Sequence, residues 1–189
     1  LLLASSSVYR RDLLSRLRLP FTCSSPDIDE GHHQGETAIE LVKRLSLEKA
    51  RALAASHPNH LIIGSDQVAV LDGRIIGKPH TYEKAHQQLT TASGASVSFL
   101  TGLTLLNSQT GHYQTDCVPF TVHMRSLSAE QIERYLRAEQ PYDCAGSFKA
   151  EGLGVSLFQR TEGDDATSLV GLPLIRLVDM LLAEGIHLP

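Results

Sequence analysis

Residues 60–80, HLIIGSDQVAVLDGRIIGKPH, constrain the fold of this chain more than any other stretch. Branched apolar residues followed by Asp72-Gly73 predict a strand over 61–71 that turns tightly into a second strand at 75–76. Asp66 and Gln67 interrupt the apolar run. An unpaired carboxylate is costly to bury, so a strand built only for packing would carry another Ile or Val there. Either the strand leaves the core at this point or a cation from elsewhere pairs with Asp66.

Strands and helices are mixed along the rest of the chain. Their expected starts carry helix-capping residues, with capping boxes formed by Thr37 with Glu40 and by Ser128 with Gln131. The pattern predicts strands over residues 1–4, 20–23, 96–106 and 112–125, and helices over 8–17, 38–55, 82–91, 129–138 and 172–184. Hairpins alternate with αβ units, so we expect an α/β (α+β mixed) fold with a mixed sheet, in a single domain spanning residues 1–189.

Composition narrows the functional classes. Hydrophobic residues make up 42% of the 189 residues and charged residues 20%, which is typical of a globular domain. No apolar run reaches the about 18 residues that a membrane span requires. The net charge of −4 argues against nucleic-acid binding through a basic surface. Three widely spaced cysteines fit neither a zinc site nor a disulfide scaffold, so we expect a cytoplasmic protein with reduced thiols.

A first polar cluster, SSSVYRR, occupies residues 5–11. It combines a small-residue turn, a helix N-terminus capped by Ser7 and two arginines, which together favour phosphate oxygens. The alternative is a capped surface helix with solvated arginines. Positive charge in the first turn is unfavourable to the helix dipole, however, so a bound anion accounts better for Arg10 and Arg11.

A second cluster, PDIDE at residues 26–30, places three carboxylates within four positions of a loop. Oxygen ligands clustered in this way suit Mg²⁺ or Mn²⁺, although a solvated acidic loop is the alternative. His32 and His33 are adjacent in the same loop and make a poor chelate, so we do not expect them to bind metal.

Two lysines complete the set. Lys49 falls on the long second helix and taken alone is typical of a surface charge, whereas Lys78 lies between Gly77 and Pro79 in a rigid turn. Lys78 is not part of a Walker A motif. Together with Asp66, these clusters predict a site for a polyphosphate and a divalent cation, in which Asp66 binds the metal, activates water, or does both.

Seven motifs, in order, resemble the Maf family of nucleotide pyrophosphatases across essentially all 189 residues: ASSSVYRRDLL, PDIDE, LEKA, GSDQV, GKP, CAGSFKAEG and LVGLPL. The resemblance implies a long, curved mixed sheet flanked by helices, in two lobes with a cleft, similar to inosine triphosphate pyrophosphatases. It also implies a homodimer that hydrolyses a nucleoside triphosphate between the α and β phosphates with Mg²⁺ or Mn²⁺.

The same resemblance assigns roles to individual residues. Asp66 becomes the catalytic aspartate and Glu30 a metal ligand, with Asp66 as a second candidate ligand. Substrate phosphates would contact the turn that holds Ser5 and Ser7. The basic residues that would bind phosphate are Arg10 or Arg11, Lys49 and Lys78.

Two further residues resemble the 7-methyl-GTP pyrophosphatase branch of the family. Gln67 follows the catalytic aspartate and Glu151 precedes the glycine of the later motif, where the branch acting on thymidine and uridine triphosphates has Thr and Gln. A Glu carboxylate can accept hydrogen bonds from a guanine edge, and Tyr9 could stack on a cationic methylated base, although this position is often Trp in the branch. The alternatives are a broader house-cleaning pyrophosphatase for modified nucleotides and a non-catalytic nucleotide-binding regulator of cell division.

Overall fold

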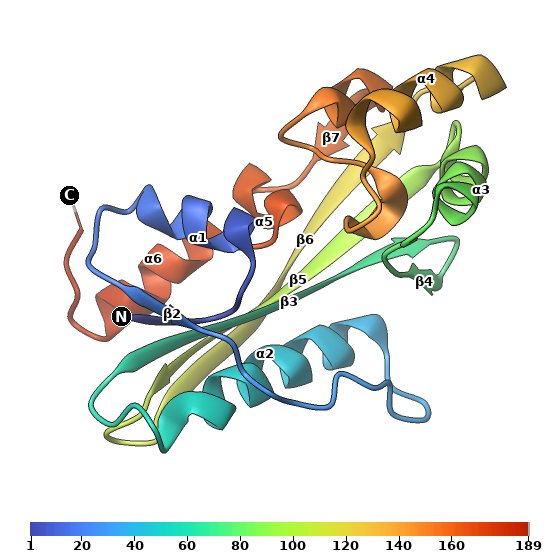
Figure 1. Cartoon of the computed structure of the whole chain (residues 1–189). Coiled ribbons are helices and arrows are strands. Elements are labelled where there is room, and N and C mark those ends of the chain that lie inside the picture. Colours follow the sequence, from blue (N-terminus) through green and yellow to red (C-terminus); the bar gives the residue numbers. More distant parts are fainter. Residues whose placement is uncertain (189) are drawn as a thin grey trace. The chain divides into compact units, whose positions relative to one another are not determined.

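The computed structural model describes residues 1–188 and contains a seven-stranded mixed sheet (Figure 1). The strands are β1 (Leu2–Ala4), β2 (Thr22–Ser24), β3 (Leu61–Leu71), β4 (Arg74–Ile76), β5 (Ser96–Asn107), β6 (Tyr113–Met124) and β7 (Phe158–Glu162). Six of them run in the order β2-β1-β3-β5-β6-β7, and β4 pairs with β3. β1 is parallel to β2 and β3, whereas the β3–β4 and β6–β7 pairs are antiparallel. The predicted mixed sheet is therefore confirmed.

The chain forms two compact units from interleaved segments. The first unit contains residues 1–67 and 100–118 together with the chain from Asp165 onward. The second unit contains residues 68–99 and 119–164. Strands β3, β5 and β6 contribute residues to both units.

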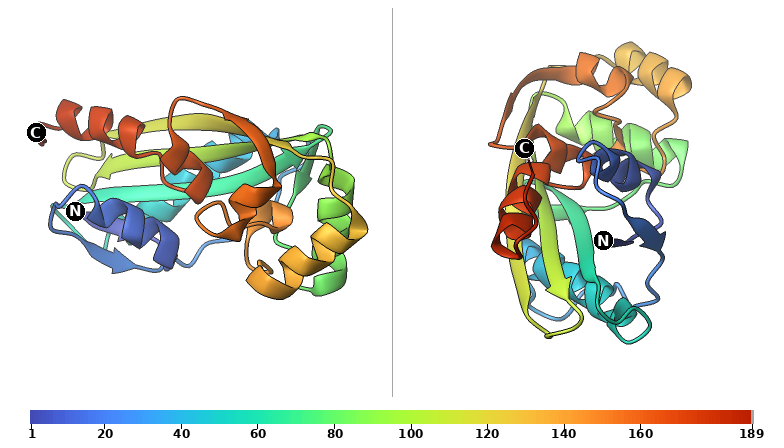
Figure 2. Two further views of the ribbon diagram at one scale, coloured as in Figure 1. Left: turned by 90° about the horizontal axis from the view of Figure 1, so that it is seen from above. Right: turned by 90° about the vertical axis from the view of Figure 1, so that its left-hand side faces the viewer.

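Helices cover both faces of the sheet in the first unit. On one face, α1 (Val8–Ser15) and α6 (Leu174–Ala183) pack through leucines such as Leu13, Leu14 and Leu177. On the other face, α2 (Ala38–Ala54) packs through Ala50 and Leu53. In Figure 2 (left), α1 and α6 lie in front of the strands and α2 lies behind them. Apolar side chains are thus removed from water on both sides of β1 and β3.

Two glycines allow α2 to lie unusually close to the sheet. A Cβ on Gly64 of β3 would lie 1.9 Å from the carbonyl oxygen of Ser46, and one on Gly102 of β5 would lie 2.0 Å from that of Val42. Neither position can hold a larger residue without moving the helix. The hydroxyl groups of Ser46 and Thr104 are hydrogen-bonded at 2.9 Å between the helix and β5. This close approach sets which residues of α2 reach the residues of β3.

The second unit contains α3 (Tyr82–Ala92), α4 (Ala129–Glu139) and two short 3₁₀ helices, η1 (Ala145–Ser147) and η2 (Leu153–Leu157). Its aromatic cluster places the Phe148 ring edge-on to Phe99 and Phe158, with centroids 5.3 and 4.9 Å away. The motif CAGSFKAEG therefore contributes Phe148 to the aromatic cluster of this unit, in addition to its polar residues.

Most predicted elements are confirmed. The bounds of β3 agree with the prediction, and Asp72 and Gly73 have φ angles of 48° and 73°, as the tight hairpin requires. Both predicted capping boxes are present. Ile39 is apolar but 50% exposed, because it lies in the first turn of α2 on the side away from the core. Three kinds of element were not predicted, namely the 3₁₀ helices, β7 and the five-residue α5 (Ala166–Val170), since none is long enough to show a period.

None of the helices described in residues 1–188 is long and apolar enough to cross a membrane.

Candidate active site

The cation that Asp66 requires is the ammonium group of Lys49. Asp66 in β3 is 8% exposed and Lys49 in α2 is 7% exposed. Lys49 Nζ donates a hydrogen bond to Asp66 Oδ1 at 2.6 Å and lies 2.9 Å from Glu30 Oε1. Removing Lys49 would leave the Asp66 carboxylate buried without its hydrogen-bonded cation, which is strongly destabilising. Residues from β3, α2 and the loop before α2 therefore meet in one charged group.

Arg10 belongs to the same group. Its Nε donates a hydrogen bond to the carbonyl oxygen of Gly171 at 2.8 Å. Burial lowers the pKa of the Arg10 guanidinium, and the nearby charges of Asp66 and Glu30 act in the opposite direction. Arg11, in contrast, is exposed on α1 and pairs with the neighbouring Asp12 at 3.5 Å. Of the two arginines in the motif, Arg10 is the one placed beside the carboxylates.

The serine turn before α1 is fixed by its own hydroxyl groups. Ser5 is buried, and its Oγ accepts a hydrogen bond from the backbone N–H of Ser7 at 3.1 Å. Ser7 Oγ in turn accepts one from the N–H of Arg10 at 3.4 Å, which confirms its predicted capping role. Tyr9 follows on the first turn of α1 and is partly buried. Whether these residues contact a phosphate or a base stays a prediction.

Gln67 ties α5 to the sheet. Its side-chain nitrogen lies 2.7 Å from the carbonyl oxygen of Ser168, 3.2 Å from that of Leu169 and 2.9 Å from Thr101 Oγ1. Ser65 Oγ donates to the carbonyl of Gly171 at 3.0 Å, the same oxygen that Arg10 contacts. Residues on both sides of Asp66 thus anchor α5 and its C-terminal Gly171. Thr101 and Ser168 were missed in the sequence because no motif or period marks them, and Ser65 was given no role although it lies in the motif GSDQV.

The loop that carries Glu30 is held by Arg44 of α2. Arg44 Nη2 donates to the carbonyl oxygen of Gly31 at 2.9 Å. Its Nε and Nη2 contact the two carboxylate oxygens of Glu36 at 2.6 and 2.9 Å. Hydrogen bonding to Arg44 is the main reason why the pKa of Glu36 falls from 4.5 to about 2.

This depressed pKa predicts how stability depends on pH. Because the folded pKa lies below the unfolded one, the Glu36 carboxylate should stabilise the protein fully above about pH 4.5 and lose that effect between about pH 4.5 and 2. We expect wild type and Glu36→Gln to differ in free energy of unfolding at pH 7, and their values to converge through that acid range in denaturant titrations. A difference that stayed constant down to pH 2 would contradict the assigned pairing.

The remaining predicted residues belong to the second unit. Lys78 is exposed in the turn before the buried Pro79, and Glu151 is exposed in the turn before η2. Burial raises the pKa of the nearby thiol of Cys144 to about 12, and the charges of Asp143 and Glu151 act in the same direction. Glu139 Oε2 accepts a hydrogen bond from the N–H of Leu153 at 2.7 Å and so holds the start of η2.

The charged group of the first unit has a donor set that suits a hard divalent cation. Glu30 and Asp66 both contact the single ammonium nitrogen of Lys49, so their oxygens converge on one point. Mg²⁺ is commonly held by one or two carboxylates together with substrate phosphates and water. Within residues 1–188 no group of three or more His, Cys, Asp or Glu side chains could hold a metal by itself. A metal bound by this pair would therefore need further oxygen ligands, such as those of a polyphosphate or of water.

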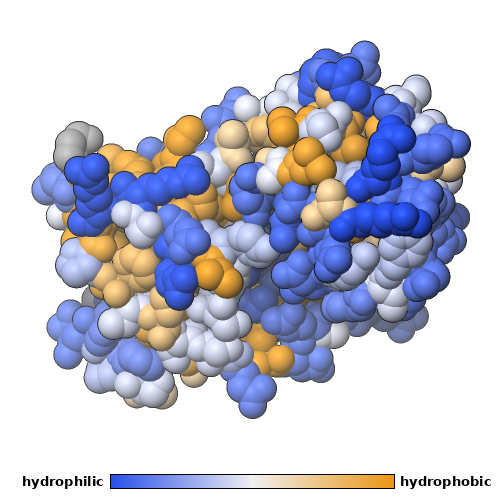
Figure 3. Space-filling view, turned by 45° about the horizontal axis from the view of Figure 1, so that its top comes forward, coloured by the Kyte–Doolittle hydropathy of each residue, from blue (hydrophilic) through white to orange (hydrophobic). Residues whose placement is uncertain are grey.

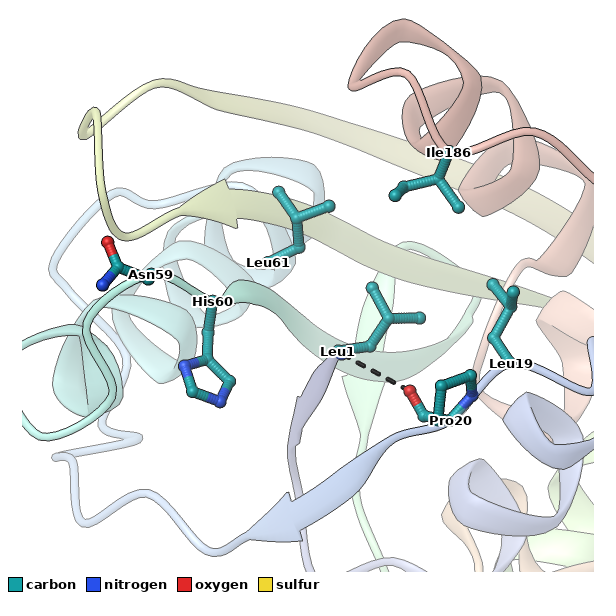
Figure 4. Close-up of a pocket in the computed structure, with 7 residues that line it drawn as sticks. All are labelled: Leu1, Leu19, Pro20, Asn59, His60, Leu61 and Ile186. Carbon is teal, nitrogen blue, oxygen red and sulfur yellow. Dashed lines mark hydrogen bonds between the residues drawn. The ribbon is translucent and has the colours of Figure 1, made fainter.

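A pocket of about 360 Å³ lies elsewhere in the first unit (Figure 4). It is lined by residues at the starts of β1 and β3, from the segment before β2 and from the chain after α6: Leu1, Leu19, Pro20, Asn59, His60, Leu61 and Ile186. The backbone nitrogen of Leu1 donates to the carbonyl oxygen of Pro20 at 3.4 Å on the wall of the pocket. None of the predicted site residues lines this pocket, so we do not assign the substrate to it.

A mixed sheet that carries a buried aspartate–lysine pair, with an arginine and an acidic loop beside it, defines an α/β protein with a charged site. The family model described as "Maf-like protein" matches residues 1–184, and the chain belongs to the Maf family. This confirms the resemblance drawn from the seven motifs.

Close relatives cover the whole chain. It is 80% identical over 189 residues to the 7-methyl-GTP pyrophosphatase of Pseudomonas fluorescens strain Pf0-1, covering 100% of this chain and 98% of that protein. Proteins of the same name from Pseudomonas aeruginosa PAO1 and Alcanivorax borkumensis SK2 are 70% and 58% identical, covering 100% of this chain and 98% and 96% of their own.

A solved structure supports the fold. The Staphylococcus aureus Ham1 protein superposes with a TM-score of 0.52, at 13% identity, over 98% of both chains. At this identity the likeness concerns the fold alone.

Proposed function

We propose that this protein hydrolyses 7-methyl-GTP to 7-methyl-GMP and pyrophosphate. The observation that carries the proposal is the buried pair of Asp66 and Lys49 with Glu30 beside it, in a chain that is up to 80% identical to proteins of that name. Well-packed apolar residues often stabilise a core as well as a buried ion pair does, or better, so packing alone does not account for this group. It does suit a substrate whose own charge must be balanced before water can attack.

In the proposed reaction a water molecule adds to phosphorus, and the bond between the α-phosphorus and the oxygen bridging to the β-phosphate breaks. Asp66 accepts the proton of that water, because its buried carboxylate is held in place by Lys49. Arg10 and Lys49 offset charge on the phosphate oxygens, and Lys78 would add a third cation. A Mg²⁺ or Mn²⁺ held by Glu30 and Asp66 would supply further charge neutralisation.

Recognition of the base is assigned to Glu151, Tyr9 and Gln67. Glu151 is exposed and therefore available to accept hydrogen bonds from the guanine edge, and Tyr9 would stack on the cationic methylated ring. Gln67 uses its nitrogen to hold α5, which leaves its carbonyl oxygen as the group that could face a substrate.

Glu151→Gln should weaken the preference for 7-methyl-GTP over UTP. Loss of charge-assisted hydrogen bonds should cost about 1–3 kcal/mol, so the ratio of the two kcat/KM values should fall by roughly 5- to 150-fold. Glu133→Gln, which removes an exposed carboxylate of α4, serves as the control and should leave the ratio unchanged. An unchanged ratio in Glu151→Gln would contradict the assignment.

The function itself is tested by pyrophosphate release with Mg²⁺ or Mn²⁺ from 7-methyl-GTP, GTP, UTP, dTTP and ITP. A large preference for 7-methyl-GTP is the expected result. Comparable rates for several modified bases would instead indicate a broader house-cleaning pyrophosphatase. Nucleotide binding without turnover would favour the regulator of cell division.

Three associated assignments stay predictions. The divalent cation is tested by chelation, which should abolish turnover until Mg²⁺ or Mn²⁺ is restored. The homodimer is tested by sedimentation. The exposed apolar residues Val8, Ile175 and Leu182 on α1 and α6 are candidates for a dimer interface. On the face displayed in Figure 3, apolar side chains are interspersed with hydrophilic ones. A cytoplasmic location is tested by cell fractionation.

A further inference from the structure

Glu30 lies in a long loop that needs an external support. The loop spans residues 25–37 between β2 and α2 and contains neither helix nor strand. Glu30 is exposed, with 60% of its side-chain surface accessible, yet its carboxylate lies 2.9 Å from the buried ammonium of Lys49. A surface ion pair of this kind contributes little by itself and cannot hold a loop of that length in place.

The support comes from the guanidinium group of Arg44. This side chain is 18% exposed and contacts the loop at two places, the carbonyl oxygen of Gly31 next to Glu30 and the carboxylate of Glu36 near the loop's end. The Glu36 side chain is only 8% exposed and also accepts the N–H of His33 at 3.1 Å. The remaining nitrogen of Arg44, Nη1, bonds Glu48 on its own helix at 3.0 Å.

The geometry of the guanidinium matters more than its charge. Its three nitrogens serve a carbonyl, a carboxylate and a helix neighbour at once. A lysine ammonium could not span the same acceptors, because it is a point charge on a flexible stem. Arg44 and Lys49 both project from α2, so the helix that supplies the buried lysine also fixes the loop opposite it.

We propose that Arg44 is a positioning residue that places Glu30 beside Lys49 and Asp66 by fixing the carbonyl of Gly31 and the carboxylate of Glu36. The inference rests on the proposed function for its catalytic consequence, but its structural part does not need a substrate. Loss of Arg44 should free the loop, withdraw Glu30 from the charged group and weaken the site's hold on a divalent cation.

Hydrogen exchange of residues 25–37 in the metal-free and nucleotide-free protein tests the structural part. Arg44→Leu should speed exchange of this segment about tenfold or more, as expected on losing charge-assisted hydrogen bonds, and Arg44→Lys should restore it only in part. Glu48→Gln is the matched control, because it removes an ion pair of the same guanidinium without touching the loop. It should leave exchange and turnover as in wild type.

The catalytic part is tested by the Mn²⁺ concentration that gives half-maximal pyrophosphate release, which should rise about tenfold in Arg44→Leu and stay unchanged in Glu48→Gln. The proposal would be overturned if residues 25–37 exchanged at the wild-type rate in Arg44→Leu, or if exchange became equally faster in Arg44→Leu and Glu48→Gln. If Arg44→Leu does not fold, the comparison of Arg44→Lys with Glu48→Gln decides it. If the wild-type protein showed no turnover but Arg44→Leu still exchanged faster than wild type, the role of Arg44 in the loop would be upheld and the proposed function would be rejected.

Discussion

Asp66→Asn should reduce pyrophosphate release by roughly 10²–10⁴-fold, the range that general-base catalysis supplies, while the protein stays folded. Asparagine has the shape of aspartate but cannot accept the proton of the attacking water. Its side-chain oxygen can still accept the hydrogen bond from Lys49, and Glu30 remains as the ionic partner of that lysine. Initial rates with saturating 7-methyl-GTP, together with a thermal unfolding curve, measure both parts of the prediction.

Asp72→Asn is the matched control for this variant. Asp72 is exposed in the turn at the end of the same strand, and Asn tolerates its positive φ of 48°. The control should retain the wild-type rate. If Asp66→Asn kept a rate within about tenfold of wild type, less than general-base catalysis normally contributes, Asp66 would not be the base.

Gly64→Ala should be strongly destabilising for a change of a single methyl group. The added Cβ would meet the backbone of α2, 1.9 Å from the oxygen of Ser46 and 3.1 Å from the nitrogen of Ala50, and neither group can rotate away. Overpacking against a fixed backbone costs about 1–3 kcal/mol or more. We expect the free energy of unfolding from denaturant titration to fall by at least about 3 kcal/mol, at the top of that range.

Gly77→Ala provides the comparison, because a Cβ there has no neighbour within 4 Å. It should leave stability within about 0.5 kcal/mol of wild type, as surface substitutions usually do. Gly64→Ala should also lower turnover in any fraction that folds, since moving α2 displaces Lys49 from Asp66. Equal stability of the two variants would mean that α2 can shift at little cost.

The sequence predicted that Asp66, if buried, would pair with a cation, but it did not predict that Lys49 would be buried beside it. A carboxylate in the middle of an apolar strand required a cation, and the structure places one 2.6 Å away. Lys49 looked like a surface charge because its helix also carries Lys43, Arg44 and Arg51. Its burial depends on how closely α2 approaches β3 and β5, and that distance follows from Gly64 and Gly102, whose spacing has no local signature.

The parts that the sequence could not predict depend on contacts between distant segments. The three acceptors of Gln67 lie 34 to 102 residues away, and α5 itself is too short to show periodicity. The starts of α1, α2, α3 and α4 were predictable because each of their caps is a local interaction over three residues. Arg44 shows both cases, since its pair with Glu48 follows from i,i+4 spacing whereas its bonds to the loop do not.

The pairing of Lys49 with two carboxylates also sets the net charge of this group before a substrate binds. Arg10 and Lys49 contribute two positive charges, and Asp66 and Glu30 contribute two negative ones. The site is therefore neutral before a substrate enters, in a protein whose net charge is −4. Because Arg10 and Lys49 are already balanced by the two carboxylates, they would offset the charge of a bare triphosphate only in part, so it should bind weakly. A triphosphate that binds together with a divalent cation carries less net negative charge. The triphosphate and the cation should therefore each strengthen the binding of the other by the same factor.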